Sequence, residues 1–156
     1  MMGCGKSSVG KNLAEKMGYH FLDTDQLIEE KEQMPIDIIF KEQGELYFRG
    51  IEKNILNDLE VNKTVIATGG GMVEMEGSFQ LFQKLGTSVY LKCSLMNLME
   101  RVADDTKARP NSKNENQFKD LLHKRTPLYE KADLVVDCDG FSVLQIAEQI
   151  SDQFRI

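Results

Sequence analysis

The sequence contains little cysteine, no long apolar run and no excess of positive charge, and each absence excludes a class of protein. Its three cysteines, Cys4, Cys93 and Cys138, are odd in number and lack the C-x-x-C spacing of a zinc site. They fit reduced thiols better than a disulfide framework, which predicts a cytoplasmic protein. No apolar run approaches the roughly 18 residues of a membrane span, and no signal-peptide hydrophobic region opens the chain.

The balance of charge excludes a second group of functions. Lysine and arginine number 19 against 25 aspartates and glutamates, which gives a net charge of −6. Proteins that bind nucleic acid or membrane surfaces need a basic face, so we expect neither partner. An anionic ligand must be held by a local cluster of bases. The 156 residues fit one domain with its own core, and we expect a monomer that binds small molecules.

Apolar residues change between strand spacing and helical spacing along the chain. The runs YHFLDTD, TVIAT, SVYLK and DLVVD predict four short strands. Because helical segments separate them, we predict an α/β fold with a parallel, doubly wound sheet. A polar, lid-like stretch is expected at about 104–116. Helices are expected over residues 6–17, 78–85, 95–103, 117–125 and 142–154, together with a long helical segment at about 26–60 that Pro35 and Gly44 interrupt.

The stretch GCGKSS has the spacing of the second half of a phosphate-binding loop, G-x-x-x-x-G-K-[ST]. Backbone N–H groups around Gly3, Cys4 and Gly5 would wrap a β-phosphate at the start of a helix. Lys6 would reach the β- and γ-phosphates, and the Ser7 hydroxyl would bind Mg²⁺. A glycine-rich helix start with a solvated lysine is the alternative, since the first glycine of the motif and an apolar strand before it are not in the sequence.

Two carboxylates, Asp23 and Asp25, end the run YHFLDTD. On an extended segment, residues two apart point the same way, toward the carboxyl edge of the sheet where ligands of open α/β folds bind. Asp23 could hold a magnesium-bound water, and Asp25 could accept a proton from a substrate hydroxyl. The alternative is an aspartate N-cap for a helix at 24–30.

Three consecutive glycines, Gly69, Gly70 and Gly71, follow the buried run TVIAT. Glycine permits positive φ and lets a ligand approach the backbone closely, so this turn is a candidate substrate contact. A flexible turn without a ligand is the alternative interpretation.

Three arginines, Arg49, Arg109 and Arg125, form a further set of candidates in this acidic chain. The guanidinium fork suits carboxylates and phosphates. Any one of them taken alone is explained as well by a solvated helix face or a surface ion pair.

Taken in order, GCGKSS, FLDTD, IIFKEQGELYFRGIE, VIATGGG, VYLK, ARP, KRTPLYEKADLVVD and DG resemble shikimate kinase over nearly the whole chain. The resemblance implies a three-layer P-loop kinase fold with a central parallel sheet of strand order 2-3-1-4-5 and a lid. The first strand of that order and the first loop glycine are expected to be missing from this chain. The implied reaction transfers the γ-phosphoryl group of ATP to the 3-hydroxyl of shikimate, which gives shikimate 3-phosphate in aromatic amino-acid biosynthesis.

The resemblance also assigns the substrate contacts. It implies that Asp25 binds the shikimate hydroxyls and acts as the base, and that Arg49 and Arg125 bind the carboxylate. The backbone of Gly69–Gly71 is expected beside the same substrate.

For the nucleotide, the resemblance implies ATP with Mg²⁺. Arg109 becomes the lid arginine that reaches the transferring phosphate, alongside Lys6. Arg101 is expected to stack on adenine, and Asp23 to lie near the metal. The nucleotide-binding set is Gly3, Cys4, Gly5, Lys6, Ser7, Ser8, Arg101 and Arg109; the metal set is Ser7 and Asp23.

Three other interpretations remain. A gluconate kinase would share the loop and the sheet, although D-G-D followed by His-Pro is expected there and this chain reads DTDQLIEE. A nucleoside monophosphate kinase is the second alternative, but the glycine turn and the paired carboxylate-binding arginines would have no evident role in that enzyme. A non-catalytic descendant that binds a ligand without turnover is the third, and the incomplete loop favours it.

Overall fold

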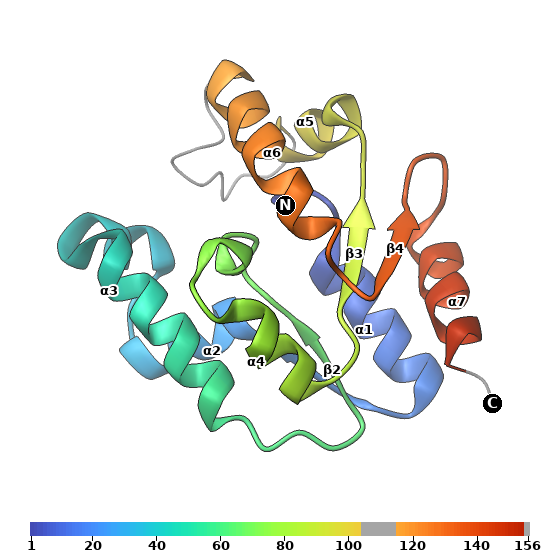
Figure 1. Cartoon of the computed structure of the whole chain (residues 1–156), viewed down its shortest axis with the longest axis horizontal. Helices are drawn as coiled ribbons and strands as arrows, with labels where there is room; N and C mark the ends of the chain where they lie inside the picture. Colours follow the sequence, from blue (N-terminus) through green and yellow to red (C-terminus); the bar gives the residue numbers. More distant parts are fainter. Residues whose placement is uncertain (104–114, 155–156) are drawn as a thin grey trace.

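The computed structural model describes residues 1–103 and 115–154, and in these ranges strands alternate with helices as predicted (Figure 1). The strands are β1 (His20–Asp23), β2 (Thr64–Ala67), β3 (Val89–Lys92) and β4 (Leu134–Asp137). The helices are α1 (Lys6–Met17), α2 (Thr24–Glu32), α3 (Ile36–Asp58), the 3₁₀-helix η1 (Met72–Glu74), α4 (Ser78–Leu85), α5 (Leu95–Ala103), α6 (Glu115–Tyr129) and α7 (Val143–Gln153). The α/β prediction is confirmed.

The strands form two separate parallel pairs. β1 pairs with β2 from His20 opposite Thr64, and β3 pairs with β4 from Val89 opposite Leu134. Among the described residues no strand lies between β2 and β3. In the expected order 2-3-1-4-5, β1 and β2 correspond to strands 2 and 3, and β3 and β4 correspond to strands 4 and 5. The expected pairing of strands 2-3 and 4-5 is therefore confirmed, but among the described residues the two pairs do not join into one sheet.

A cleft of about 360 Å³ lies between the two strand pairs. Residues of β2, β3 and α1 line it, together with Met1 and the aromatic rings of Phe79 and Phe82 from α4. In the described ranges, β2 and β3 each have a strand partner on one side only. Their other edges leave backbone N–H and C=O groups without a sheet ladder.

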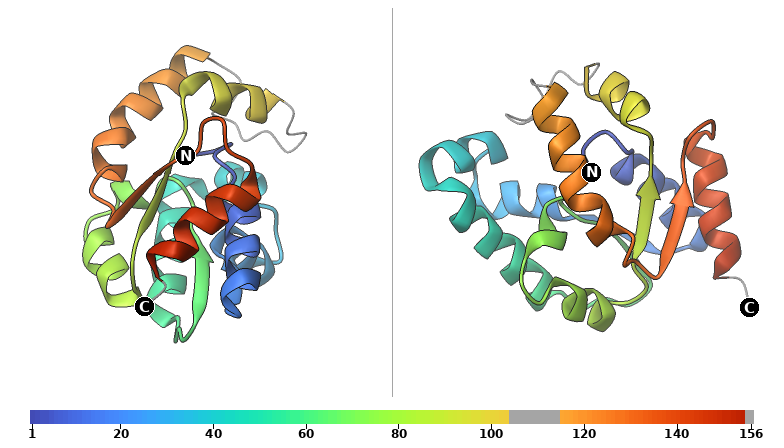
Figure 2. Two further views of the ribbon diagram at one scale, coloured as in Figure 1. Left: turned by 90° about the vertical axis from the view of Figure 1, so that its right-hand side faces the viewer. Right: turned by 45° about the horizontal axis from the view of Figure 1, so that its top comes forward.

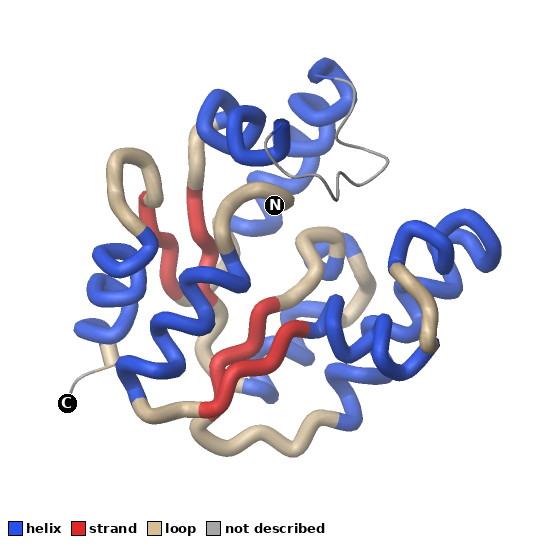
Figure 3. Tube along the Cα trace, turned by 180° about the vertical axis from the view of Figure 1, so that it is seen from behind, coloured by secondary structure: helices blue, strands red, loops and turns tan. Residues whose placement is uncertain are grey.

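Helices cover both faces of the strands. α1 contacts β1 and β2, and it packs along α7, which in turn contacts β4. Figures 2 and 3 show α7 and α1 side by side. On the other side of the molecule α4 and α6 both contact η1, and α2 packs on α3. α1 therefore links the two strand pairs through α7.

Local sequence explains where α1 and α3 begin, bend and end. α1 starts at Lys6 as predicted, and Gly18 (φ 65°) ends it in the left-handed conformation that glycine tolerates best. The predicted interruption of the long helical segment occurs at Gly44, whose φ of 83° and ψ of 172° break the helical path. The helix N-terminal to this break and the one C-terminal to it therefore take different directions.

Helix α6 extends four residues past its predicted end at residue 125. The Thr-Pro step at Pro127 is typical of a helix end, because proline has no N–H and crowds the preceding turn. Tyr129 in the last turn is buried, and its hydroxyl donates a hydrogen bond to the Gly70 carbonyl at 2.7 Å. This tertiary contact holds the last turn of α6 in place.

The apolar interior has three clusters. The largest surrounds β3, β4, α1, α6 and α7; a second lies between α2 and α3; a third joins α3, η1 and α4. All three cysteines are free and buried. None of the helices in the described residues is long and apolar enough to cross a membrane.

Candidate active site

The glycine-rich turn that leads into α1 adopts a conformation that suits glycine. Gly3 (φ 76°) and Gly5 (φ 85°) both lie in the left-handed region. Gly5 is the N-cap of α1 and forms no side-chain cap, so no capping side chain competes for the first N–H groups of the helix. A β-carbon on Gly3 would lie 2.9 Å from the Leu98 carbonyl oxygen, which shows how closely α5 approaches the turn.

Lys6 brings a positive charge to this turn, close to Cys4 and to the amino terminus. The Lys6 Nζ donates to the Met1 carbonyl at 2.7 Å and lies 3.8 Å from the Cys4 sulfur. Burial raises the pKa of the Cys4 thiol, but the charges of Lys6 and the amino terminus outweigh it, so the pKa lies below its usual value. Burial also lowers the pKa of the Met1 amino group to about 5, and Lys6 adds to this effect.

The two predicted aspartates differ in backbone conformation. β1 ends at Asp23, and Asp25 lies in the first turn of α2, so the prediction that both extend from one strand is wrong. The reason is the cap: the Asp23 carboxylate accepts a 3.0 Å hydrogen bond from the Asp25 N–H and starts the helix. Its other oxygen accepts a 2.5 Å hydrogen bond from the Ser7 hydroxyl. The structure thus brings Ser7 and Asp23 together.

The glycine turn after β2 allows close packing. Glycine permits positive φ, but Gly69, Gly70 and Gly71 are not among the residues with positive φ. Glycine is needed for space instead: a β-carbon on Gly69 would overlap the Glu52 carboxylate, and one on Gly71 would overlap the Arg49 guanidinium. The closely packed side chains hold this turn in a defined position.

Arg49 reaches the glycine turn from α3. Its Nη1 donates to Glu52 at 2.5 Å, and its Nη2 donates to Glu45 at 3.1 Å. The Glu52 side chain is fully buried, whereas Glu45 is 65% exposed. Sequence reasoning missed Glu52, although its position three residues after Arg49 on a helix is a recognisable ion-pair spacing.

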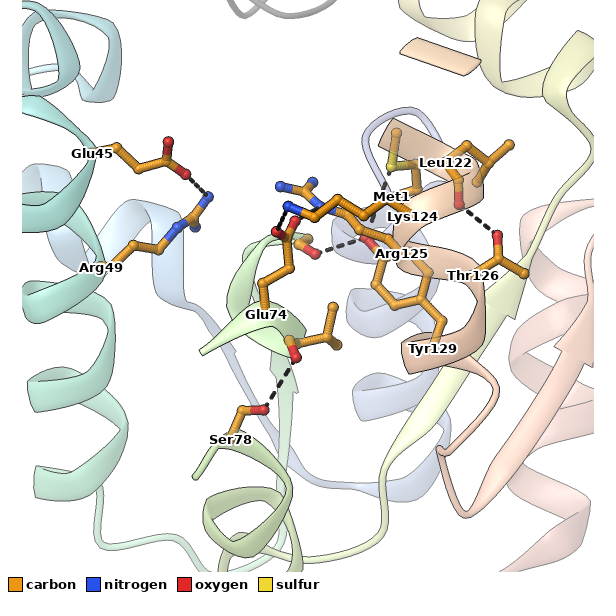
Figure 4. Close-up of polar contacts among 12 residues, drawn as sticks. Met1, Glu45, Arg49, Glu74, Ser78, Leu122, Lys124, Arg125, Thr126 and Tyr129 are labelled. Atoms are coloured by element: carbon orange, nitrogen blue, oxygen red, sulfur yellow. Dashed lines mark hydrogen bonds and ion pairs between the residues drawn. The ribbon is translucent and has the colours of Figure 1, made fainter. Parts of the chain in front are cut away.

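Arg125 approaches the same turn from α6. Its side chain is 9% exposed, and its Nε donates to Glu74 at the end of η1. Lys124 donates to the other oxygen of Glu74 at 2.5 Å. Figure 4 shows Arg49 and Arg125 extending from α3 and α6, with Glu74 between them in this view. Sequence reasoning missed Glu74 as well, because 51 residues separate it from Arg125.

The substrate and nucleotide candidates are neighbours in space. A β-carbon on Gly69 would lie 3.3 Å from Asp25 Oδ1, and one on Gly70 would lie 3.3 Å from the Met1 Cα. The Gly69 N–H also donates to the buried Thr24 hydroxyl at 3.2 Å. The glycine turn, α2 and the phosphate-loop candidate therefore surround one region.

The remaining predicted residues either lie near the phosphate-loop candidate or fall outside the described residues. Ser8 follows Ser7 in the first turn of α1. A β-carbon on Gly5 would lie 3.7 Å from the Arg101 Nη1, so the Arg101 side chain of α5 lies close to the phosphate-loop candidate. Arg109 and residues 104–114 of the predicted lid are outside the described residues. In the described ranges, no group of three or more His, Cys, Asp or Glu side chains could hold a metal ion.

Comparison with known proteins agrees with this arrangement. A family model described as shikimate kinase matches residues 2–155. The chain is 38% identical to a shikimate kinase from Persephonella marina, over 99% of this chain and 94% of the relative. It is 40% identical to one from Thermodesulfovibrio yellowstonii, over 99% of this chain and 91% of the relative.

Solved structures give the same result. The shikimate kinase from Acinetobacter baumannii in complex with shikimate superposes with a TM-score of 0.92 at 34% identity, covering 98% of this chain and 88% of that one. The enzyme from Bacteroides thetaiotaomicron gives a TM-score of 0.88 at 28% identity, with 99% and 94% coverage. Since the match extends over nearly the whole chain in both sequence and fold, the protein belongs to the shikimate kinase family of ATP-dependent kinases.

Proposed function

We propose that this chain transfers the γ-phosphoryl group of ATP to the 3-hydroxyl of shikimate, giving shikimate 3-phosphate, at the region between the phosphate loop and the glycine turn. The observation that carries the proposal is the approach of Arg49 and Arg125, from two different helices, to the short segment Gly69–Glu74. Two guanidinium groups bind a carboxylate by charge-assisted hydrogen bonds. Shikimate carries one carboxylate together with ring hydroxyls, and Asp25 lies beside the same turn.

The nucleotide phosphates are assigned to the N-terminus of α1. Backbone N–H groups from Gly3 to Gly5 and the positive end of the helix favour an anion there. Lys6, next to Gly5, supplies the positive charge that a transferring phosphoryl group needs. Ser8 lies in the same helical turn, and Arg101 approaches the loop from α5 and is assigned to the adenine.

Mg²⁺ is assigned to Ser7 and Asp23. The hydroxyl and the carboxylate are 2.5 Å apart beside the phosphate loop, and both are the oxygen ligands that magnesium prefers. These residues fit an ion that keeps most of its water and phosphate ligands, which agrees with the lack of a larger acidic cluster in the described residues. When bound, the ion neutralises charge on the β- and γ-phosphates.

The acceptor is assigned to the glycine turn. Arg49 and Arg125 would hold its carboxylate, and the Gly69–Gly71 backbone would contact the ring. Asp25 would accept the proton of the attacking hydroxyl as the oxygen–phosphorus bond forms. Fixing both reactants in this way reduces the entropy cost of bringing them together, and this positioning acts alongside electrostatic stabilisation in phosphoryl transfer.

Further assignments complete the proposal. We assign Arg109, outside the described residues, to the transferring phosphate, and residues 104–116 to a lid over the site. The segment 26–60, which contains most of α2 and all of α3, is assigned to substrate binding within a single domain. A monomeric, cytoplasmic enzyme without nucleic-acid or membrane partners is supported by the net charge of −6 and the three free thiols.

The proposal is tested by measuring ADP release with shikimate, and with gluconate as the alternative acceptor, in the presence of Mg²⁺. Arg49→Ala and Arg125→Ala should each weaken shikimate binding by about 1.5–3 kcal/mol, since each removes a hydrogen bond between charged groups. ATP affinity should change less than about threefold, or roughly 0.7 kcal/mol. Lys53→Ala, an exposed cation on α3, is the matched control and should change neither.

Three results would contradict the proposal. Phosphorylation of gluconate in place of shikimate would favour the gluconate kinase interpretation. Shikimate binding without ADP release would favour a non-catalytic binding protein. Equal losses of ATP and shikimate affinity in both arginine variants would remove the arginines from the acceptor site.

A further inference from the structure

An ion pair connects the glycine-turn segment to α6. Glu74, the last residue of η1, uses both carboxylate oxygens: Oε1 accepts from Arg125 Nε, and Oε2 accepts from Lys124 Nζ at 2.5 Å (Figure 4). The Arg125 side chain is 9% exposed and the Glu74 side chain 24% exposed, whereas Lys124 is 67% exposed. The partly shielded half of this cluster is therefore the Glu74–Arg125 pair.

Glu74 is charged at neutral pH. Partial burial raises its pKa, but the hydrogen bonds and positive charges of Lys124 and Arg125 outweigh burial, so the pKa lies below its usual value. A charged carboxylate gives Arg125 a counter-charge in an environment where an unbalanced guanidinium would be costly.

The atom that Glu74 contacts determines what this pair does to the arginine. Glu74 accepts from Nε, the donor nearest the chain, which is one of the five N–H donors in the rigid guanidinium plane. The other four donors are on the two terminal nitrogens. A carboxylate that fixes Nε sets the plane of the guanidinium, and so sets where the terminal nitrogens point.

We propose that Glu74 is a positioning residue for acceptor binding: it holds Arg125 through Nε and so directs the terminal nitrogens of Arg125 toward the carboxylate of the acceptor. This inference rests on the proposed function, in which Arg125 binds the carboxylate of shikimate.

The test uses the full chain and measures two properties. Calorimetry gives the dissociation constants of shikimate and of Mg·ADP, and a coupled assay gives kcat and the KM values. Glu74→Ala should raise the shikimate dissociation constant and KM on the order of tenfold, the range of coupling between contacting residues. Mg·ADP affinity and kcat should change less than about twofold, a few tenths of a kcal/mol. Glu74→Gln, which keeps an oxygen acceptor, should restore part of the loss.

Matched variants separate positioning from a general effect. Glu76→Ala removes an exposed carboxylate two residues away and should leave all constants unchanged. Lys124→Ala keeps the Glu74–Arg125 pair and should have little effect. In an Arg125→Ala background, Glu74→Ala should cause no additional loss, because its action passes through Arg125.

Each remaining outcome contradicts a different statement. Unchanged shikimate affinity in Glu74→Ala, or full additivity with Arg125→Ala, overturns the role of Glu74. Tighter shikimate binding in Glu74→Ala also overturns it and makes Glu74 a competitor. If the unaltered chain binds shikimate without turnover, the proposed function fails while the binding data still test Glu74. If it binds no shikimate, both fail.

Discussion

The two arginines assigned to the acceptor are held in different ways in the half of the molecule around β1–β2 and in the half around β3–β4. Arg49, on the side of the β1–β2 pair, takes both carboxylate partners from its own helix: Glu45 four residues earlier and Glu52 three residues later. Arg125, on the side of the β3–β4 pair, takes Glu74 from a segment 51 residues away. The first arrangement forms with the helix, whereas the second forms only when α6 packs on η1.

This difference makes the proposed acceptor site dependent on how the two halves pack together. Apart from the Glu74–Arg125 pair, the Tyr129 hydroxyl joins α6 to the Gly70 carbonyl at 2.7 Å. Within residues 1–103 and 115–154 the strands do not connect the halves, since the cleft of about 360 Å³ lies between β2 and β3. The position of Arg125 relative to Arg49 therefore rests on a few side-chain contacts and on helix packing.

The largest expected effect concerns the local pair. Glu52→Ala removes the fully buried partner of Arg49 and should lower the free energy of unfolding by about 1.5–3 kcal/mol. Glu45→Ala, which removes the exposed partner, should cost less than about 1 kcal/mol. Urea unfolding of both variants measures the difference. Equal losses would show that burial does not distinguish the two partners.

The second prediction concerns chemistry in the β1–β2 half. Asp25→Asn keeps the shape of the side chain and removes the charge that is proposed to accept the proton. We expect kcat to fall on the order of 10²-fold, with the melting temperature nearly unchanged. Steady-state kinetics with saturating shikimate and ATP provide the measurement. Normal kcat with a raised KM would make Asp25 a positioning residue only.

The third prediction concerns the cleft between the halves. A segment of about six valines and isoleucines joined ahead of Met1 should pair with β2 and β3 and bury apolar side chains there. A gain of about 2 kcal/mol corresponds to a rise in melting temperature of roughly 4–8 °C. A glycine–serine segment of equal length is the control. An equal rise with both segments would show that the cleft does not accept a strand.

The two variants with a segment joined ahead of Met1 also test how stability depends on pH. Burial holds the Met1 amino group at a pKa of about 5, against 8.0 in its unperturbed state. The unfolded chain therefore binds a proton between pH 8 and pH 5 that the folded chain does not, so stability should fall as the pH is lowered through this range. Both added segments remove the amino group from this position and should abolish the slope.

The smallest expected effect concerns the pair that connects the halves. The Glu74 pKa lies below its usual value of 4.5 in the folded protein. Its charge therefore contributes stability above pH 4.5, and this contribution is lost as the pH falls through the folded pKa. At pH 7 the free energy of unfolding of the unaltered chain should exceed that of Glu74→Gln by about 0.5–1 kcal/mol. Urea unfolding measures both proteins at pH 7 and pH 3, and their free energies of unfolding should become similar at pH 3. A difference that stays constant with pH would contradict the stabilising ion pair.

Much of the arrangement could be predicted from local sequence. The four strands, the start of α1 at Lys6 and the break at Gly44 follow from residue spacing and glycine conformation. The errors arose where a distant or capping contact overrode the local pattern. Asp25 belongs to α2 because Asp23 caps that helix. α6 passes Pro127 because its last turn is tied to the glycine turn.

The sequence by itself determined the family, through motifs along nearly the whole chain, and the start of α1 at Lys6, through residues close together. Only the tertiary structure decided that Glu74 holds Arg125 and that the strands form two pairs with a cleft between them. The physical reason is the separation along the chain over which each interaction acts. Hydrogen bonds within a helix and backbone preferences act over a few residues, whereas an ion pair across 51 residues requires the packing of α6 against η1.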